Sequence, residues 1–423
     1  MHPAPKKLIV IGGGAAGFFC AINAAKLYPA LQVTLIEKTS KLLSKVKVSG
    51  GGRCNVTHAC DSIAEMIKRY PRGASFLKKA FHNFFTTDTV QWFNERGVEL
   101  KTEEDGRMFP LSNSSQTIID CFLNEAARYK VEILMNTQVS SLQKDEENWI
   151  LELANAKSVT ANFVCVACGG FSKYEQFGWL HNTGHSIESP VPSLFTFNLK
   201  QHSITGLMGI SVPNVSVKIA GTKLHESGPI LITHWGFSGP AILKLSAWGA
   251  RELAEKNYNF VAMVNWLPEY NEVTLKDKMQ QLRFQIAAQK VVNRNPFQLP
   301  ARLWEYFLQQ CGIDADLRWA DLPAKDQNKL VKMLCTNEFP VQGKTTFKEE
   351  FVTAGGIDLS EVDTQTMQSK KSGGIFFAGE ILNIDGITGG YNFQSAWTTG
   401  WIAAKGVGKE LGIRDLVNSS SIE

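Results

Sequence analysis

The sequence predicts an α/β protein in which a parallel sheet is interrupted by a β-rich insertion and a helical segment. Three observations indicate this. A strand, a glycine turn, a helix and a second strand open the chain, short runs punctuated by proline and glycine begin near residue 190, and helical periodicity fills residues 273–336. With 423 residues the chain is long enough for two or three domains that each bury a core.

The first element is a βαβ unit. Residues 7–11 (KLIVI) have the continuous apolar character of a buried parallel strand. GGGAAG follows at residues 12–17, then a helix through Lys26, then a second strand at residues 33–36 that ends before Glu37. A glycine turn between strand and helix, followed about 20 positions later by an acidic residue, indicates a Rossmann-like dinucleotide-binding domain.

Each position of this unit has an expected role. Gly12 permits the tight turn, Gly14 lets the backbone approach a pyrophosphate, and Gly17 lets the helix pack against the strand. The amides and dipole at the helix N-terminus attract phosphates. Glu37 is expected to accept hydrogen bonds from an adenosine ribose, which disfavours a 2′-phosphate, so FAD or NAD fits better than NADP.

A second glycine cluster occupies residues 49–58 (SGGGRCNVTH). Glycines beside Arg53 and Asn55 indicate backbone that comes close to a flat or anionic group, with side chains that can donate to it. Composition alone leaves open a loop without a ligand. From here to Tyr129 the chain is predicted to be helical and basic.

Strand-like segments precede the insertion. They lie at residues 131–135, 139–142, 149–153 and 163–167. From Pro190 short β-rich runs suggest a barrel or sandwich. We therefore predict a nucleotide-binding domain at 1–190 and 352–423, a barrel-like domain at 191–272 and 337–351, and a helical domain at 273–336.

A third glycine cluster lies near the C-terminus. The buried strand predicted within residues 373–380 is followed by DGITGGYN at residues 385–392 and then by a helix. This order again directs amides and a helix N-terminus at a ligand. Both ends of the chain are therefore expected to hold one extended cofactor.

Two further patterns carry a weaker functional signal. Cys165 and Cys168 form a CxxC inside an apolar strand run, with no second pair at zinc spacing, so we predict no metal site. In residues 233–243 (THWGFSGPAIL), Ser238 is expected to cap a helix that has Pro240 in its first turn. His234 is a catalytic candidate, although packing or capping is the alternative role.

Composition favours an ordinary globular protein. The formal charge is +4, with 44% hydrophobic and 20% charged residues. Eight scattered cysteines favour reduced thiols and a cytoplasmic location. Glycines interrupt the apolar run at residues 8–22, so we expect no signal peptide there, and no stretch approaches the length of a membrane span.

Together the three glycine clusters resemble the BaiN/YhiN-like (RdsA-type) family of NAD(P)/FAD-dependent oxidoreductases. Its hallmark strings are GGGxAG, SGxGRCNxTN and GExLDxDGxTGGYN, and the match spans essentially the whole chain. The resemblance implies a Rossmann-like FAD-binding domain of the two-dinucleotide-binding-domain type, assembled from both chain ends, with barrel-like and helical insertions. It also implies non-covalent FAD, with NADH or NADPH as a transient electron donor.

The resemblance assigns cofactor contacts residue by residue. The first cluster and Glu37 meet the ADP half of FAD, Val139 meets adenine through its backbone, and the second and third clusters surround the flavin and ribitol. The full cofactor-binding set is Gly12, Gly14, Ala15, Ala16, Gly17, Glu37, Lys38, Arg53, Cys54, Asn55, Val139, Gly169, Gly170, Gly379, Glu380, Asp385, Thr388, Gly389, Gly390 and Asn392.

The chain departs from the family pattern at several positions. Cys168 replaces a threonine before Gly169, and His58 replaces an asparagine. Leu43 and Ser44 replace a glycine and a basic residue, and the loop after Gly170 lacks its usual string. These departures bear on the substrate more than on FAD.

One branch of the family resembles an enzyme that reduces a uridine of large-subunit ribosomal RNA to dihydrouridine. This reaction needs a hydride and a proton, and Cys54 or His58 is the candidate acid. An RNA partner also needs a basic patch and an unpaired, flipped-out base. Nine cations provide such a patch: Lys41, Lys45, Lys47, Arg53, Lys68, Arg69, Arg72, Lys78 and Lys79.

Alternatives remain open. A charge run is often only a solvated face. The enzyme alternative is a small-molecule flavin oxidase or dehydrogenase acting on an aminoacetone-like amine, an unsaturated acid or a steroid-like ring. The third reading is an FAD-binding protein without turnover, since a fold does not determine function.

Overall fold

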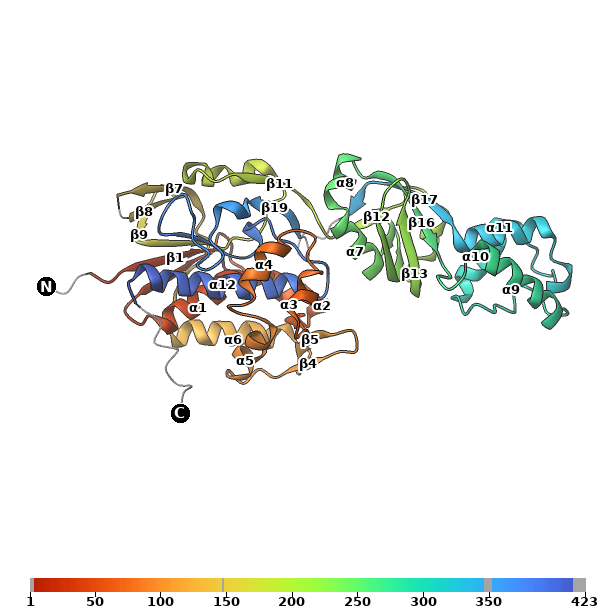
Figure 1. The fold of residues 1–423 in the computed structure, drawn as a ribbon, viewed down its shortest axis with the longest axis horizontal. Coiled ribbons are helices and arrows are strands. Elements are labelled where there is room, and N and C mark those ends of the chain that lie inside the picture. The colour runs from red at the N-terminus through yellow and green to blue at the C-terminus, as the bar shows by residue number, and fades with distance from the viewer. Residues whose placement is uncertain (1–3, 147, 346–351, 414–423) are drawn as a thin grey trace. The chain divides into compact units, whose positions relative to one another are not determined.

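The computed structural model describes residues 4–146, 148–345 and 352–413, which form two compact units (Figure 1). Unit 1 comprises the described residues up to 192 and from 352 onward, and unit 2 comprises residues 193–345. The parts of the predicted domains at 346–351 and 414–423 lie outside the described residues. Among the helices that are described, none combines the length and apolarity required to cross a bilayer.

Unit 1 is built on a five-stranded parallel sheet with strand order β20-β10-β1-β2-β6. The strands are β1 (Lys7–Ile11), β2 (Gln32–Ile36), β6 (Glu132–Leu134), β10 (Phe163–Val166) and β20 (Ile375–Phe377). Strands from both ends of the chain share this sheet. The predicted parallel α/β fold is therefore confirmed.

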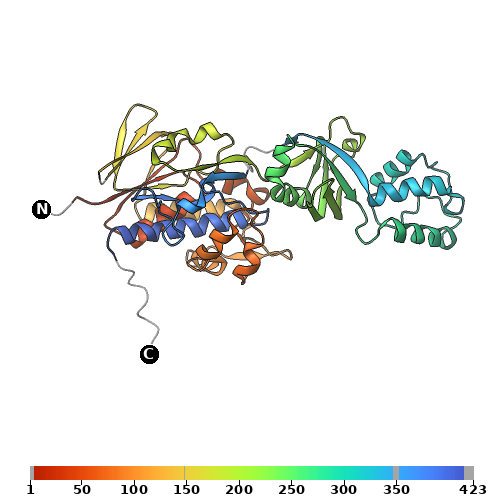
Figure 2. The ribbon, with the colours of Figure 1, turned by 45° about the horizontal axis from the view of Figure 1, so that its top comes forward.

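Helices α1 (Ala15–Leu27) and α12 (Tyr391–Glu410) lie side by side in unit 1 (Figures 1 and 2). Gly400 makes the close approach possible, because a Cβ there would lie 2.8 Å from the Ala16 carbonyl oxygen. Phe19 of α1 and Trp397 of α12 pack with ring centroids 5.4 Å apart. The helix that begins at the first glycine cluster therefore packs on the helix that begins at the third.

The region between β2 and β6 contains short strands as well as the predicted helices. The elements are α2 (Ser44–Gly52), β3 (Thr57–His58), α3 (Ile63–Ile67), α4 (Ala74–Ala80), α5 (Thr86–Asn94), β4 (Leu100–Thr102), β5 (Arg107–Pro110) and α6 (Ser115–Arg128). The three strands form one antiparallel sheet in the order β3-β5-β4. Strands of two to four residues are too short to show alternation in a sequence.

Two further sheets complete unit 1. One is antiparallel, with β7 (Val139–Asp145), β8 (Asn148–Leu153) and β9 (Ser158–Ala161). The other pairs β11 (Ile187–Pro192) with β19 (Thr353–Ile357). Short 3₁₀ helices are η1 (Tyr174–Thr183), η4 (Leu359–Glu361) and η5 (Gly379–Ile381).

Unit 2 contains a seven-stranded antiparallel sheet with strand order β17-β16-β13-β14-β15-β12-β18. Its strands are β12 (Thr196–Asn198), β13 (Ser211–Ile219), β14 (His225–Thr233), β15 (Gly236–Ser238), β16 (Asn259–Asn265), β17 (Asn337–Gln342) and β18 (Lys344–Thr345). Its helices are η2 (Ser203–Leu207), α7 (Pro240–Trp248), α8 (Ala250–Glu255), α9 (Glu272–Gln285), α10 (Ala301–Cys311), η3 (Trp319–Asp321) and α11 (Ala324–Cys335).

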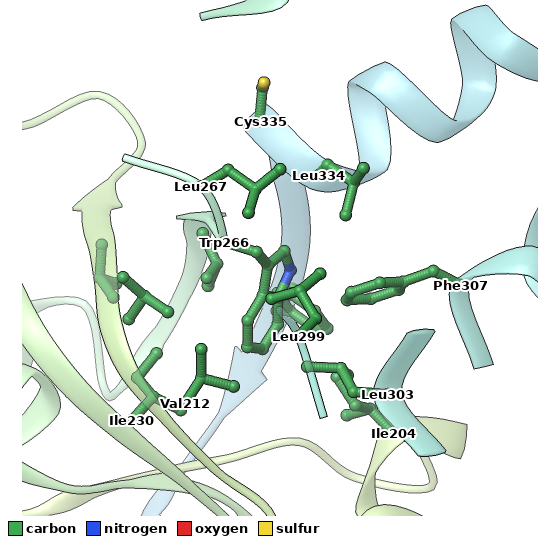
Figure 3. Packing of buried hydrophobic residues seen from close by; sticks show 14 of the residues in the cluster. Ile204, Val212, Ile230, Trp266, Leu267, Leu299, Leu303, Phe307, Leu334 and Cys335 are labelled. Atoms are coloured by element: carbon green, nitrogen blue, oxygen red, sulfur yellow. The ribbon is translucent and has the colours of Figure 1, made fainter. Parts of the chain in front are cut away.

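The sheet and the helices of unit 2 share one hydrophobic core. Trp266, which follows β16, packs on Phe307 of α10 with ring centroids 5.5 Å apart (Figure 3). It also packs on Phe339 of β17. The buried cluster runs from Phe195 to Val341 and includes side chains of the sheet and of α9, α10 and α11. Burial of this kind stabilises the sheet and the helices together.

One local prediction in unit 2 is wrong. Helix α7 begins at Pro240 as expected, but its N-cap is Gly239, with φ +99°, and not Ser238. Ser238 is the last residue of β15 and pairs with Leu231 of β14. A Cβ at Gly239 would lie 2.9 Å from the Pro229 carbonyl oxygen, so this tight connection requires glycine.

Candidate cofactor and active site

Contacts within the protein require glycine at two positions of the first cluster. Gly12 has φ +116°, and a Cβ there would lie 2.5 Å from the Ala167 carbonyl oxygen of the neighbouring strand end. A Cβ at Gly17 would lie 1.9 Å from the Gly12 carbonyl oxygen. The helix therefore presses directly on the turn, as the spacing of the glycines predicts.

Gly14 differs because a Cβ there would meet no atom within 4 Å. It is the N-cap of α1, so the first amides of the helix, at Ala15 and Ala16, follow it directly. Amides at a helix start have no acceptor within the helix and bind anions. Packing within the protein therefore does not demand glycine at this position, and the space before these amides is where the sequence predicts a pyrophosphate.

The Glu37 carboxylate is held beside this turn. One oxygen accepts a hydrogen bond from the Gly13 amide at 2.9 Å, and the other accepts from the Thr39 amide and hydroxyl, both at 2.9 Å. Lys38 places its ammonium 5.7 Å from the centre of the Phe171 ring. An acceptor fixed just beyond β2 is suited to a ribose of the cofactor.

The second cluster exposes its backbone. Gly50, Gly51 and Gly52 have φ values of +58°, +69° and +83°, and a Cβ at Gly51 or Gly52 would meet nothing within 4 Å. The Arg53 side chain is held by two other residues. Its guanidinium lies 3.9 Å from the centre of the Phe109 ring and donates to Glu103 at 2.5 Å. The loop thus offers amides, while Arg53 already has an acidic partner.

The second cluster contacts the third through Asn55. With its amide in the orientation that satisfies both groups, Asn55 donates to the Thr57 carbonyl and accepts from the Gly390 amide, each at 3.0 Å. Gly390 has φ +92°, and a Cβ there would lie 2.5 Å from the Thr57 carbonyl oxygen. Glycine at this helix start is therefore required by the strand that touches it.

His58 joins the same contact. Its Nδ1 donates to the Gly389 carbonyl at 3.1 Å, which leaves Nε2 as the unprotonated nitrogen of the neutral ring. The ring stacks on Tyr391, with centroids 4.8 Å apart and planes 25° apart. Burial lowers the pKa of His58, and it raises that of Tyr391 to about 12, so both rings are neutral at pH 7.

Long-range partners brace the third cluster. Asp385 is fully buried and forms an ion pair with Arg72 through both guanidinium and carboxylate forks. Asn392 accepts from the Gly386 amide at 2.8 Å and donates to its carbonyl at 2.9 Å. The structure therefore gives the predicted cofactor residues Asp385 and Asn392 partners within the protein.

The third cluster also reaches the first. A Cβ at Gly379, which has φ +75°, would lie 2.7 Å from the Ala16 Cβ, and its amide donates to the Thr399 hydroxyl at 2.9 Å. Glu380 accepts from the Thr353 amide at 2.8 Å and forms an ion pair with Lys45 of α2. All three glycine clusters are thus brought together in unit 1.

The remaining predicted cofactor residues differ in burial and in their neighbours. A Cβ at Gly12 would lie 2.6 Å from the Cα of Cys168, and one at Gly170 would lie 3.1 Å from Glu380, so the 168–170 turn joins the clusters. Thr388 is half-buried in the third cluster. Val139 is buried at the start of β7, opposite Leu153.

The three catalytic candidates differ in burial. Cys54 is fully buried, and burial raises the pKa of its thiol to about 12. His58 is half-buried at the contact between the second and third clusters. His234 is exposed between β14 and β15 in unit 2, beside Trp235.

The thiols are all free. Each of the eight cysteines lies within the described residues and forms no disulfide. Cys165 is buried against Cys20, which raises its pKa, and burial raises the pKa of Cys168 to about 12. The thiols of Cys165 and Cys168 are therefore protonated at neutral pH.

Two features of the site were missed from the sequence. Arg72 and the chain around it lie along the third cluster, where Arg72 and Asp385 form an antiparallel bridge. Tyr391, which belongs to the TGGYN string, supplies the ring on which His58 stacks. The tyrosine was visible within the motif, whereas no local pattern links Arg72 to a residue more than 300 positions away.

The chain is similar to known proteins over nearly its whole length. The HI0933-like protein Rossmann domain model matches residues 6–406. The ribosomal RNA dihydrouridine synthase of Escherichia coli is 31% identical over 407 residues, covering 94% of this chain and 96% of its own. The enzyme of the same name from Haemophilus influenzae is 29% identical over 415 residues, covering 95% and 98%.

A third relative acts on a different substrate class. The 3-dehydro-bile acid delta(4,6)-reductase of Clostridium scindens is 25% identical over 413 residues, covering 94% of this chain and 97% of its own. Together with the family match, these relatives confirm the resemblance seen in the three motifs.

Solved structures share the fold. The 3-ketosteroid delta1-dehydrogenase of Sterolibacterium denitrificans superposes with a TM-score of 0.50 at 12% identity, covering 95% of this chain and 99% of that one. Quinol fumarate reductase of Escherichia coli gives a TM-score of 0.50 at 14% identity, covering 98% and 72%.

Proposed function

The chain belongs to the HI0933-like Rossmann domain family and is an FAD-dependent oxidoreductase, and on that premise we propose that it reduces a uridine of large-subunit ribosomal RNA to dihydrouridine. The observation that supports the substrate most strongly is full-length similarity to two proteins named ribosomal RNA dihydrouridine synthase. The joined glycine clusters support the cofactor. Such a substrate would place the protein in the cytoplasm.

The reaction converts the C5–C6 double bond of uracil to a single bond. It consumes one NADH or NADPH and one proton, so that one ring carbon gains a hydride and its neighbour gains a proton. Hydride transfer is the chemistry that FAD supplies when bound. The protein supplies binding, orientation and the proton.

We assign the two halves of FAD to different clusters. The amides of Ala15 and Ala16 would hold the pyrophosphate and Glu37 a ribose, because these groups surround the open space at Gly14. Gly51, Gly52 and Gly389 would lie along the flavin. The exposed backbone of the second cluster supports this, since a flat ring can approach only where no side chain intervenes.

For the proton, we favour His58 over the other two candidates. Cys54 is fully buried and His234 is exposed beside Trp235, whereas His58 is half-buried where the second and third clusters meet and stacks on Tyr391. Because its pKa is lowered, His58 would have to take up a proton during the reaction before donating it. The rate at which the RNA substrate reoxidises the reduced flavin tests this assignment. If that rate is the same in His58→Ala, in Cys54→Ala and in the wild type, neither residue is the acid.

The decisive experiment is mass spectrometry of ribosomal RNA from a deletion strain. We expect one dihydrouridine of the large subunit to disappear and to return when the wild-type chain is restored. An unchanged dihydrouridine pattern would remove this substrate. Purified protein should also be yellow, and protein that stays colourless after addition of excess FAD would remove the cofactor.

A small-molecule reductase is the second candidate, because similarity to the bile acid reductase also covers nearly the whole chain. It predicts flavin reoxidation by a purified unsaturated acid or steroid in the absence of RNA. Identity is lower for this relative, at 25% against 31%, so we place it second.

A further inference from the structure

The cations of residues 41–79 fall into two groups. Four have acidic partners: Lys45 with Glu380, Arg53 with Glu103, Lys68 with Glu65, and Arg72 with Asp385. The other five form no ion pair with any described residue: Lys41, Lys47, Arg69, Lys78 and Lys79. Only the second group has its charge available for an anionic partner without breaking an ion pair.

Arg69 is the member of this second group that is tied to the third cluster. It lies between α3 and α4, and its carbonyl oxygen accepts a hydrogen bond from the Ile387 amide at 3.0 Å. Three residues later, Arg72 pairs with Asp385. The backbone of Arg69 is thus held against the loop that leads to Tyr391, while its side chain is exposed.

The positive charge of Arg69 also acts on the stacked rings of His58 and Tyr391. It contributes to lowering the pKa of His58 and opposes the rise in the pKa of Tyr391. Arg107 acts on His58 in the same way, but Arg107 donates to Asp105 at 2.7 Å and to Glu103 at 3.1 Å. Among the described residues, Arg69 is the cation whose charge acts on both His58 and Tyr391 and that forms no ion pair with a carboxylate.

We infer that Arg69 binds a backbone phosphate of the RNA beside the uridine that is reduced, and so positions that nucleotide at the His58–Tyr391 pair. This rests on the proposed function. A base that leaves its stack to enter a pocket keeps its phosphates at the entrance. A guanidinium is suited to this position because its planar fork binds phosphate oxygens in pairs, and such contacts set position without reading sequence.

Lys68 provides a matched control. It is adjacent to Arg69, exposed and equally charged, but it donates to Glu65 at 2.6 Å. Lys68→Ala and Arg69→Ala therefore remove the same charge from neighbouring positions. Arg69→Lys keeps the charge and removes the fork. Flavin absorbance of each purified variant reports whether unit 1 is folded and loaded.

The measurement is the affinity of the holoprotein for a large-subunit ribosomal RNA fragment at several salt concentrations, together with KM and kcat for that fragment. For Arg69→Ala we expect binding weaker by roughly tenfold and a log–log salt slope smaller by about 0.7–0.9, the value for one lost phosphate contact. KM should rise far more than kcat falls, because the lost interaction is present in both ground and transition states. Arg69→Lys should fall between, and Lys68→Ala should match wild type.

The inference is overturned if Arg69→Ala keeps the wild-type salt slope, if Lys68→Ala reduces it equally, or if the wild-type protein binds no RNA. Wild-type protein that binds RNA but forms no dihydrouridine would remove the proposed reaction instead. In that case the salt slopes still decide for or against the phosphate contact.

Discussion

The first and third glycine clusters both precede a helix in unit 1, but they are built differently. In the first, the contacts that demand glycine at Gly12 and Gly17 involve backbone atoms of the turn itself and of the adjacent strand end. In the third, side chains from distant parts of the chain hold the loop, among them Asn55 and Arg72. The Gly17 contact therefore lies within the first turn itself, whereas Asn55 and Arg72 hold the third cluster from positions more than 300 residues away.

This difference has an energetic consequence. Steric contacts of a backbone turn fail only when a side chain is added. Buried polar contacts fail when either partner is removed, because the other partner is left without its hydrogen bonds. Mutations should therefore separate the two clusters.

The largest effect is expected for Arg72→Met, which leaves the fully buried Asp385 carboxylate without its guanidinium. Removing one partner of a buried ion pair costs about 3–5 kcal/mol. Urea unfolding followed by fluorescence would measure this loss. The double variant Arg72→Met/Asp385→Leu should recover most of the lost free energy of unfolding. If Arg72→Met alone stays within about 1 kcal/mol of the wild type, roughly the size of a surface effect, the buried ion pair does not brace the third cluster.

A second pair of variants tests the first cluster. Gly17→Ala places a Cβ 1.9 Å from a backbone oxygen and should destabilise the protein by about 1–3 kcal/mol or more. Gly14→Ala meets no protein atom within 4 Å, so it should unfold at nearly the wild-type urea concentration yet bind FAD more weakly. FAD titration beside urea unfolding separates the two. Equal FAD affinity for Gly14→Ala and wild type would argue against a pyrophosphate at this position.

A smaller effect is expected for Asn392→Ala, which removes two hydrogen bonds to the backbone of Gly386. The expected loss is about 1–2 kcal/mol, measured by thermal or urea unfolding. Asn83→Ala is the control, because Asn83 is exposed and its side chain donates only a long 3.5 Å hydrogen bond, to Gln365. If both variants lose the same stability, Asn392 does not brace the loop.

The smallest effect concerns pH. Burial lowers the pKa of His58, and also of His185 and His202, below the ordinary 6.5. The unfolded chain then binds more protons, so the free energy of unfolding should fall as pH drops below about 6.5. Urea unfolding at pH 7.5 and pH 5.5 would measure this. His58→Gln should reduce the difference between the two pH values, and an unchanged difference would show that His58 does not contribute.

Much of the fold was predictable because its signals are local. The strand at 7–11, the glycine spacing and Glu37 all lie within one stretch of the chain, where each pattern has a single physical explanation. The strands β3, β4 and β5 were missed because two to four residues show no period. Ser238 was misassigned as a cap because the close approach of Pro229 cannot be read from the flanking residues.

The candidate site was predictable only in part. Glycine clusters could be read as cofactor turns one at a time, but their mutual contacts, such as Asn55 with Gly390, join residues more than 300 positions apart. The same holds for the cations of residues 41–79. Their number is visible in the sequence, whereas which of them are neutralised depends on Glu380, Glu103 and Asp385.

The amino-acid sequence alone therefore determined where the glycine turns lie and where no side chain covers the backbone, because these properties depend on a few neighbouring residues. Tertiary structure decided which glycine loops meet and which charges remain available, because a hydrogen bond or ion pair depends on distance in space and not along the chain. Arg69 and Arg72 show this most directly. They lie three residues apart, and only the folded chain gives one of them a buried carboxylate and leaves the other exposed.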